Sequence, residues 1–231
     1  VVNAKLFLLD VNGARVEDLQ TGDEITKGST LETDEAGQAN IYFGDGSVAR
    51  LDAKTKIIIT DGAFSADTGT LAVRLALLVG NVWSKVVALA TPESLWEVKT
   101  PNSVATVRGT AFGVGYDPLI KKTDMYVSEH AVALKPLDPK TGDAASEVET
   151  LVNSGEGMAM EDKDSEAAKT DDGVLTRKVR TMKSNELAAW MRRFEAEDEK
   201  LDARIEELRN QGLEDRDLKQ KLREDIREEF K

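Results

Sequence analysis

Apolar and polar residues alternate over short runs along the first two thirds of the chain. Residues 38–43, 56–60, 95–100 and 131–134 are such runs, and turn sequences such as Asn12-Gly13 separate them. A period of two residues is that of a β-strand with one buried face. Roughly a dozen short strands with no helical pattern between them predict a mainly β domain, an antiparallel β-sandwich or roll.

Two stretches predict more specific features of this domain. Asp45-Gly46 lies between alternating runs and predicts a two-residue type I′ hairpin turn that joins a strand ending at Phe43 to residues 48–51. Residues 71–87 are the most apolar stretch of the chain. They predict a buried strand pair with its turn near Gly80-Asn81; a buried helix is the competing interpretation, because Leu and Ala favour helices.

The hydrophobic period changes after Ser184. Apolar residues there recur every three or four positions, which places them on one face of a helix, although Asp198 interrupts this stripe. Ser184 is the predicted N-cap and Gly212 the predicted stop before a second helix. Short helices of this kind cannot hide an apolar face alone, so each must pack on the β portion, on the other helix or on another copy. The predicted interface residues are Leu187, Trp190, Met191, Phe194, Leu201, Ile205, Leu208, Leu218, Leu222, Ile226 and Phe230.

These patterns divide the chain into three regions. We expect an all-β domain at 1–160, a linker at 161–183 and an α-helical appendage at 184–231 that is broken near Gly212. The linker follows a stretch, residues 138–173, that is rich in charged and small residues and has material for one last strand at most.

Composition excludes several classes of function. The 231 residues contain no cysteine and one histidine, which removes thiol catalysis, Cys-ligated metal centres and disulfides, and leaves His130 as the one imidazole. A net charge of -12 argues against nucleic acid as a partner. The chain has no run of roughly 18 apolar residues, so we expect no membrane span in it. It begins with Val1 rather than Met, and we expect that a signal or anchor was removed.

Each candidate for chemistry has a simpler structural interpretation. Glu129 and His130 are adjacent, but neighbouring strand residues point to opposite faces, which disfavours an acid–base pair. Asp10 opens a loop that lacks most ligands of a calcium loop. Gly109 to Gly115 is glycine-rich without the strand-then-helix context of a phosphate loop. Aromatic residues in amphipathic segments usually belong to the core, as we expect for Trp83, Trp96 and Trp190. We therefore expect no catalytic, cofactor-binding or metal-binding residues and no cofactor.

A combined set of motifs is more specific than any one of them. It consists of residues 19–23, Gly44-Asp45-Gly46-Ser47, residues 100–112 with the run Val107-Arg108-Gly109-Thr110-Ala111-Phe112, and residues 152–156. In this order the set resembles the FecR-like domain family over about residues 1–160. The resemblance implies an all-β extracytoplasmic domain, which in the namesake bacterial regulators receives a signal from an outer-membrane transporter and controls a sigma factor. One departure is His130, which stands where the family's strand has a glycine.

The motif residues also have a physical interpretation. Pro101 is expected to start a strand where no donor is needed, Gly109 to permit a bulge, and a buried Arg108 to cross-link the fold through its five donors. The expected structural motif comprises Asp45, Gly46, Ser47, Thr100, Pro101, Val107, Arg108, Gly109, Thr110 and Phe112.

The sequence leaves three functions open. The first is a non-enzymatic extracytoplasmic binding or assembly module, periplasmic or at the cell surface, whose partner is itself, as a homo-oligomer or filament, or another protein. The second is the periplasmic sensor part of a sigma-factor regulatory protein that lacks its membrane anchor here. The third, which ranks lowest, is a carbohydrate-binding or cleaving enzyme with two carboxylates about 5 to 10 Å apart.

Overall fold

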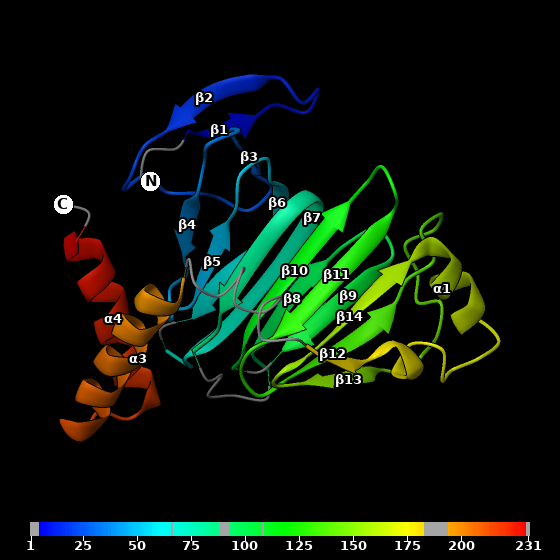
Figure 1. Ribbon diagram of the computed structural model, residues 1–231. Helices are drawn as coiled ribbons and strands as arrows, with labels where there is room; N and C mark the ends of the chain where they lie inside the picture. The colour runs from blue at the N-terminus through cyan, green and yellow to red at the C-terminus, as the bar shows by residue number, and fades with distance from the viewer. Residues whose placement is uncertain (1–4, 66, 88–92, 108, 183–193, 230–231) are drawn as a thin grey trace.

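The protein is mainly antiparallel β structure, with 44% of residues in strands and 19% in helices, as the sequence predicted. This computed structural model describes residues 5–65, 67–87, 93–107, 109–182 and 194–229 (Figure 1). The strands are β1 Leu6–Leu9, β2 Arg15–Leu19, β3 Thr30–Thr33, β4 Ala39–Tyr42, β5 Val48–Leu51, β6 Lys56–Ser65, β7 Thr70–Lys85, β8 Leu95–Lys99, β9 Ser103–Val107, β10 Ala111–Asp117, β11 Lys122–Val127, β12 Ala131–Pro136, β13 Thr150–Asn153, β14 Glu156–Glu161 and β15 Arg180–Thr181. The helices are α1 Asp162–Ala168, the 3-10 turn η1 Thr176–Lys178, α3 Glu195–Asn210 and α4 Asp215–Glu229.

The long strand β7 joins two sheets and so organises the β body, by which we mean strands β1 to β15. One sheet runs β2-β1-β3-β6-β7-β8-β9-β12-β13, and the other runs β4-β5-β7-β10-β11-β14-β15. Residues 70–79 of β7 pair with β6, and residues 80–85 pair with β10. Among the described strand pairs, β7 with β8 is parallel and the others are antiparallel.

The bend of β7 at Gly80 replaces the turn that the sequence predicted there. Residues 71–85 do form a strand, but it is one continuous strand rather than a pair, and over residues 71–78 only alternate residues are buried. Gly80 has φ +89°, and a Cβ on it would lie 2.4 Å from Oγ1 of Thr55. Glycine alone adopts this backbone without strain, so the chain bends from one sheet into the other instead of reversing.

The hairpin of β4 and β5 is confirmed, but its turn differs from the prediction. Gly46 has φ +88°, whereas Asp45 is not among the residues with positive φ. The amide of Gly46 donates to the carbonyl of Phe43 over 3.0 Å, and Phe43 N donates to Ser47 O over 2.9 Å. The pairing of Phe43 with Ser47 leaves a loop of three residues, and a loop of this length is a type I turn closed by a left-handed glycine.

Residues 100–103 form a second corrected turn. Thr100 N donates to the carbonyl of Ser103 over 2.8 Å and closes the hairpin of β8 and β9. Pro101 thus lies in the turn and not at the start of a strand, because its fixed φ suits the second position of a turn. Gly109 has φ +87°, the conformation expected of a bulge glycine.

A single main core lies between the two sheets, where alternate residues of each strand meet. Its largest fully buried members include Trp96 and Phe112. Trp83 is also buried, but on the other face of β7, beside the C-terminal helices. The core interpretation of these aromatic residues is confirmed, while Trp190 lies outside the described residues.

The segment expected to be a linker contains regular structure. β14 runs directly into α1, whose N-cap Glu161 and third residue Asp164 bond each other's backbone in a capping box. Ser165 and Ala168 are buried, and Lys178 pairs with Asp164. Residues 161–178 are therefore packed on the β body, because these contacts outweigh the local polarity of the sequence; the division into domains stays a prediction.

The two predicted C-terminal helices are present as α3 and α4. Gly212 has φ +84°, its amide donates to Arg209 O, and the amide of Leu213 donates to Leu208 O. This Schellman motif confirms the predicted stop. The described part of the first helix begins after Phe194, and the predicted N-cap Ser184 lies outside the described residues. None of the described helices is long and apolar enough to cross a membrane.

Candidate helix-binding face on the β body

The C-terminal helices lie against one side of the β body, next to β4 and β5 (Figure 1). We call residues 194–229, with α3 and α4, the helical hairpin. Arg204 on α3 binds Asp225 on α4 through two nitrogens, at 2.8 and 2.7 Å, and so joins the two helices. The hairpin contacts a surface made by β5, by the end of β7 and by the Asp45–Ser47 turn, and we call this surface the helix-binding face.

Aromatic stacking fixes the start of α3 on this face. The ring of Phe194, the N-cap residue, lies 6.3 Å from that of Trp83 at 19°, so the two rings are stacked. The guanidinium of Arg50 lies 5.6 Å from the Phe194 ring, within cation–π range. Phe194 and Trp83 are both buried, so this contact excludes water from the charged groups beside it.

Asp198 is the central acceptor of the interface. Its carboxylate accepts a hydrogen bond from Nη1 of Arg50 and one of 2.9 Å from Nε1 of Trp83. Nε of Arg50 also donates to Glu197 over 3.0 Å. The Arg50 side chain is 2% exposed, so its charge depends on these two carboxylates. Residues 148 positions apart in sequence are joined by this contact.

Lys85 forms a second charged link at the end of β7. Its Nζ donates to both oxygens of Glu129 and to Asp202 on α3, each over 2.8 Å. Burial lowers the pKa of Lys85, but the hydrogen bonds to Asp202 and Glu129 outweigh burial and leave the pKa raised. Lys85 therefore stays charged and ties the helix to the body.

The other end of the interface is apolar. Val87, Leu208, Leu218 and Leu222 form a small buried cluster. A Cβ added to Gly46 would lie 2.7 Å from Cδ1 of Leu222, so the glycine lets α4 approach the turn. In the same turn, Asp45 accepts bonds from N and Oγ of Ser47 over 2.9 and 2.8 Å, and Val87 N donates to Oγ of Ser47 over 2.9 Å.

A buried lysine of α4 faces this turn without a hydrogen-bond partner. Lys219 is 1% exposed, and its Nζ has no acceptor. Burial lowers the pKa of Lys219, and the negative charges of Asp45 and Asp215 only partly offset this effect. Burial also raises the pKa of Asp45, which its bonds to Ser47 only partly offset. Charge on both groups is therefore disfavoured in the docked state.

The interface is complementary in charge. The body contributes the cations Arg50 and Lys85 and the indole donor of Trp83, and the hairpin contributes the carboxylates of Glu197, Asp198 and Asp202. Burial raises the pKa of Asp198, although Arg50 and Trp83 favour its charged form. Such a surface can select a helix that carries acidic residues at matching positions.

The predicted structural motif residues lie in several parts of the β body. Asp45, Gly46 and Ser47 lie in the helix-binding face. Around the second turn, Oγ1 of Thr100 is 2.9 Å from that of Thr123, which donates to Asn102 over 2.6 Å. Val107 and Phe112 are in the main core, and Thr110 bonds the Ala131 carbonyl over 3.2 Å. Arg108 lies outside the described residues, so its predicted cross-link stays a prediction.

The predicted interface residues that the structure describes pack inside this one chain. Phe194, Leu208, Leu218 and Leu222 are buried, and Leu201, Ile205 and Ile226 are partly buried. The sequence left open which surface buries the apolar faces of the helices. In the structure, the β body and the other helix bury them. Leu187, Trp190, Met191 and Phe230 lie outside the described residues. Association with a second copy stays a prediction.

The sequence did not point to Arg50, Trp83, Lys85 or Lys219 as parts of one surface. One signal was available in the sequence. Asp198 interrupts an apolar stripe, and a carboxylate buried with that stripe needs a cation or hydrogen-bond donor as its partner. Glu129 binds Lys85, and the exposed His130 adopts φ +57°, so the two do not form an acid–base pair. Within the described parts of the chain, no three His, Asp or Glu residues are placed to hold a metal ion.

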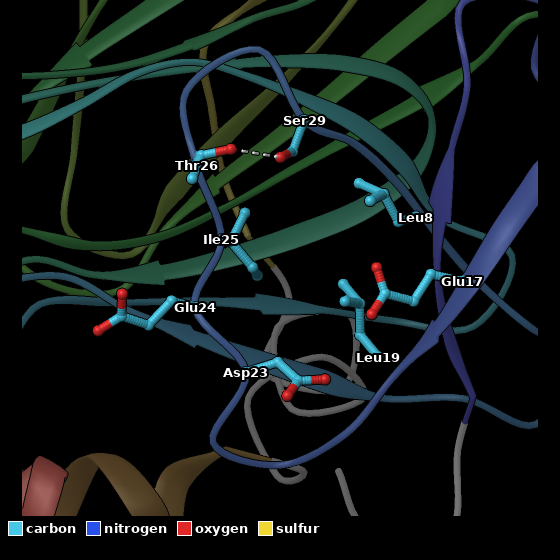
Figure 2. A pocket seen from close by; sticks show the side chains of 8 residues that line it. All are labelled: Leu8, Glu17, Leu19, Asp23, Glu24, Ile25, Thr26 and Ser29. Carbon is cyan, nitrogen blue, oxygen red and sulfur yellow. Dashed lines mark hydrogen bonds between the residues drawn. The ribbon is translucent and has the colours of Figure 1, made fainter.

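A hollow of about 200 Å³ near β1 and β2 is a poor ligand site. Figure 2 shows the apolar side chains of Leu8, Leu19 and Ile25 there, with the Glu24 carboxylate apart from that of Asp23. Asp23 already accepts the amide of Gln20 over 2.6 Å. The volume is below the few hundred Å³ usual for small-molecule sites.

Comparisons with known proteins found one matching family and two solved structures. The family model described as FecR protein matches residues 29–132. No curated protein matches the chain. Two crystal structures of a candidate anti-sigma factor from Parabacteroides distasonis ATCC 8503, at 1.65 and 2.50 Å resolution, each align with a TM-score of 0.49 and 14% identity. They cover 70% of this chain and 64% and 63% of those chains, so the alignment spans less than two thirds of either neighbour.

The matched range contains the Gly44–Ser47 turn and the whole run from Thr100 to Phe112, and it is shorter than the 160 residues expected from the sequence. Residues 29–132 of this chain therefore match the FecR family model.

Proposed function

We propose that this chain is a non-enzymatic, extracytoplasmic FecR-domain module that binds a protein helix through its helix-binding face. The observation that carries the proposal is that Arg50, Trp83 and Lys85 already hold α3, a helix of the chain itself. A surface that recognises one helix through side chains has the chemistry to recognise another of the same pattern.

The composition of the face supports a role in protein binding. Tryptophan and arginine are the residues that contribute most often to binding hot spots, and here they meet in a site closed to water. Trp83 stacks on an aromatic ring and donates from its indole, and Arg50 binds two carboxylates. The face can therefore combine apolar contact with selection for acidic residues.

An extracytoplasmic location is part of the same proposal. The FecR match supports it, and a chain without cysteine is compatible with an oxidising compartment. Cell fractionation with an antibody against the chain tests this part, and recovery from the cytoplasm alone would contradict it.

A labelled peptide of residues 194–229 tests the binding function. We expect it to bind the full-length variant Asp198→Arg, whose own hairpin is repelled by Arg50, with a micromolar Kd in fluorescence anisotropy. The wild-type chain, whose face is occupied, is the control and should bind at least tenfold more weakly. A peptide that binds neither chain would refute the proposal.

Regulation of a sigma factor is a second candidate function, and the FecR match is the observation that favours it. The helix-binding face would then receive a signalling protein. A sigma-factor gene beside the gene for this chain, with transcripts that change when the chain is deleted, would support this role. Unchanged transcripts would argue for binding or assembly instead.

A further inference from the structure

We infer that a second copy of this chain can occupy the helix-binding face, so that two chains exchange their helical hairpins. This inference rests on the proposed function and names its partner. Every copy carries a helix already known to fit the face, because the hairpin and the face belong to one sequence.

The contacts that hold the hairpin come from side chains far apart in sequence. Arg50 and Asp198, Trp83 and Asp198, and Lys85 and Asp202 are separated by 148, 115 and 117 residues. Each contact depends on the two side chains and not on the covalent path between them. A hairpin from another copy therefore makes the same contacts.

The hairpin is held unevenly, which favours exchange. At the α3 end, each charged group of the body has a carboxylate partner. At the α4 end, Lys219 is buried without a hydrogen-bond acceptor, and the other buried side chains are a small apolar cluster. A buried ammonium without a hydrogen-bond acceptor opposes docking, and the negative charges of Asp45 and Asp215 offset only part of this cost. The α4 end is therefore the part that separates most readily.

Concentration decides between the two arrangements. A tethered hairpin has an effective concentration on the order of millimolar at its own face, so dilute chains keep their own hairpins. The net charge of -12 opposes the approach of two chains, and salt screens this repulsion. The pair of Arg50 with Asp198, whose side chains are 2% and 11% exposed, is screened less. Exchange should therefore increase with both protein and salt concentration.

Complementation between two full-length variants tests the inference. Arg50→Glu disables the face and leaves the hairpin intact, whereas Asp198→Arg disables the hairpin and leaves the face intact. We expect each variant to sediment as a monomer and an equimolar mixture at 20 μM each to form a 1:1 heterodimer. The double variant Arg50→Glu/Asp198→Arg restores opposite charges within one chain and should stay monomeric when mixed with wild type.

The possible outcomes are distinguishable. A mixture that remains monomeric, while both variants keep the circular dichroism of the wild type, would overturn the inference. If Arg50→Glu does not fold, Arg50→Met takes its place, because it removes the charge without reversing it. If the 194–229 peptide binds Asp198→Arg but the mixture forms no heterodimer, the face binds helices and the second copy is not the partner. If neither binds, the proposed function fails as well.

Discussion

Replacing Asp198 by alanine removes the carboxylate that joins the helical hairpin to the β body. Arg50 then keeps only Glu197, whose side chain is 45% exposed, and the indole N–H of Trp83 loses its acceptor. Asp198 lies on the hairpin, but the groups left without a partner lie in the body. We therefore expect the hairpin to undock while the β body stays folded.

The magnitude follows from the burial of the two donors. An unpaired buried N–H costs about 1 to 3 kcal/mol. Breaking a buried ion pair costs about 3 to 5 kcal/mol, less here because Glu197 remains. Alanine also removes the unfavourable free energy of desolvating the Asp198 carboxylate, which raises the pKa of Asp198. The net loss in docking free energy is about 3 kcal/mol, a change of roughly 150-fold in the docking equilibrium.

Hydrogen exchange and tryptophan fluorescence measure this loss. Amides in 195–210 should exchange at least tenfold faster in Asp198→Ala, and the emission of Trp83 should shift to the red. Asp202→Ala is the matched control: Asp202 is half exposed and Lys85 retains Glu129, so we expect a loss under about 1 kcal/mol. Unchanged exchange in Asp198→Ala would refute the reasoning.

Three further predictions follow from the same structure. Lys219→Met removes a buried charge that has no hydrogen-bond acceptor and should stabilise the hairpin by about 1 to 3 kcal/mol, measured by hydrogen exchange. The control Lys200→Met, at an exposed position, should change the exchange little. A loss of protection in Lys219→Met would contradict this prediction. Burial raises the pKa of Asp45, so the docked state binds a proton at Asp45 more tightly than the open state does. Protection of the hairpin, corrected for intrinsic exchange, should therefore increase as the pH falls from 7 towards the ordinary value near 3.9. A decrease that begins at pH 6 would show the opposite sign. Gly80→Ala puts a Cβ against Thr55 and should lower the Tm by at least about 5 °C. In Gly69→Ala the added Cβ meets no atom within 4 Å, so the Tm should fall by less. Equal decreases in Tm would mean that the Gly80 contact is unimportant.

The strand pattern could be predicted because burial alternates residue by residue in strands such as β3, β9 and β11. The path of β7 could not, because an apolar strand that crosses between two sheets has the same composition as two strands joined by a turn. Gly80 supports either interpretation until its contact with Thr55 is known. Local pattern therefore gave the class of fold but not the route of its longest strand.

The helix-binding face could not be predicted from the sequence for a similar reason. Arg50, Lys85 and Asp198 each look like surface residues in their own segments, and only the tertiary structure brings them together. The sequence showed the apolar stripe of the hairpin but not what buries it. The β body, the other helix and a second copy of the chain are all compatible with the same pattern. A polar residue inside a predicted apolar stripe was the one local sign.

The affinity of the helix-binding face for a helix in trans tests the account most directly. The Kd of the 194–229 peptide for the Asp198→Arg chain can be compared with that of the same peptide carrying Asp198→Asn. The account predicts that the unmodified peptide binds at least tenfold more tightly, because only its carboxylate neutralises the buried Arg50. Equal affinities would show that the Arg50 and Asp198 contact does not direct recognition.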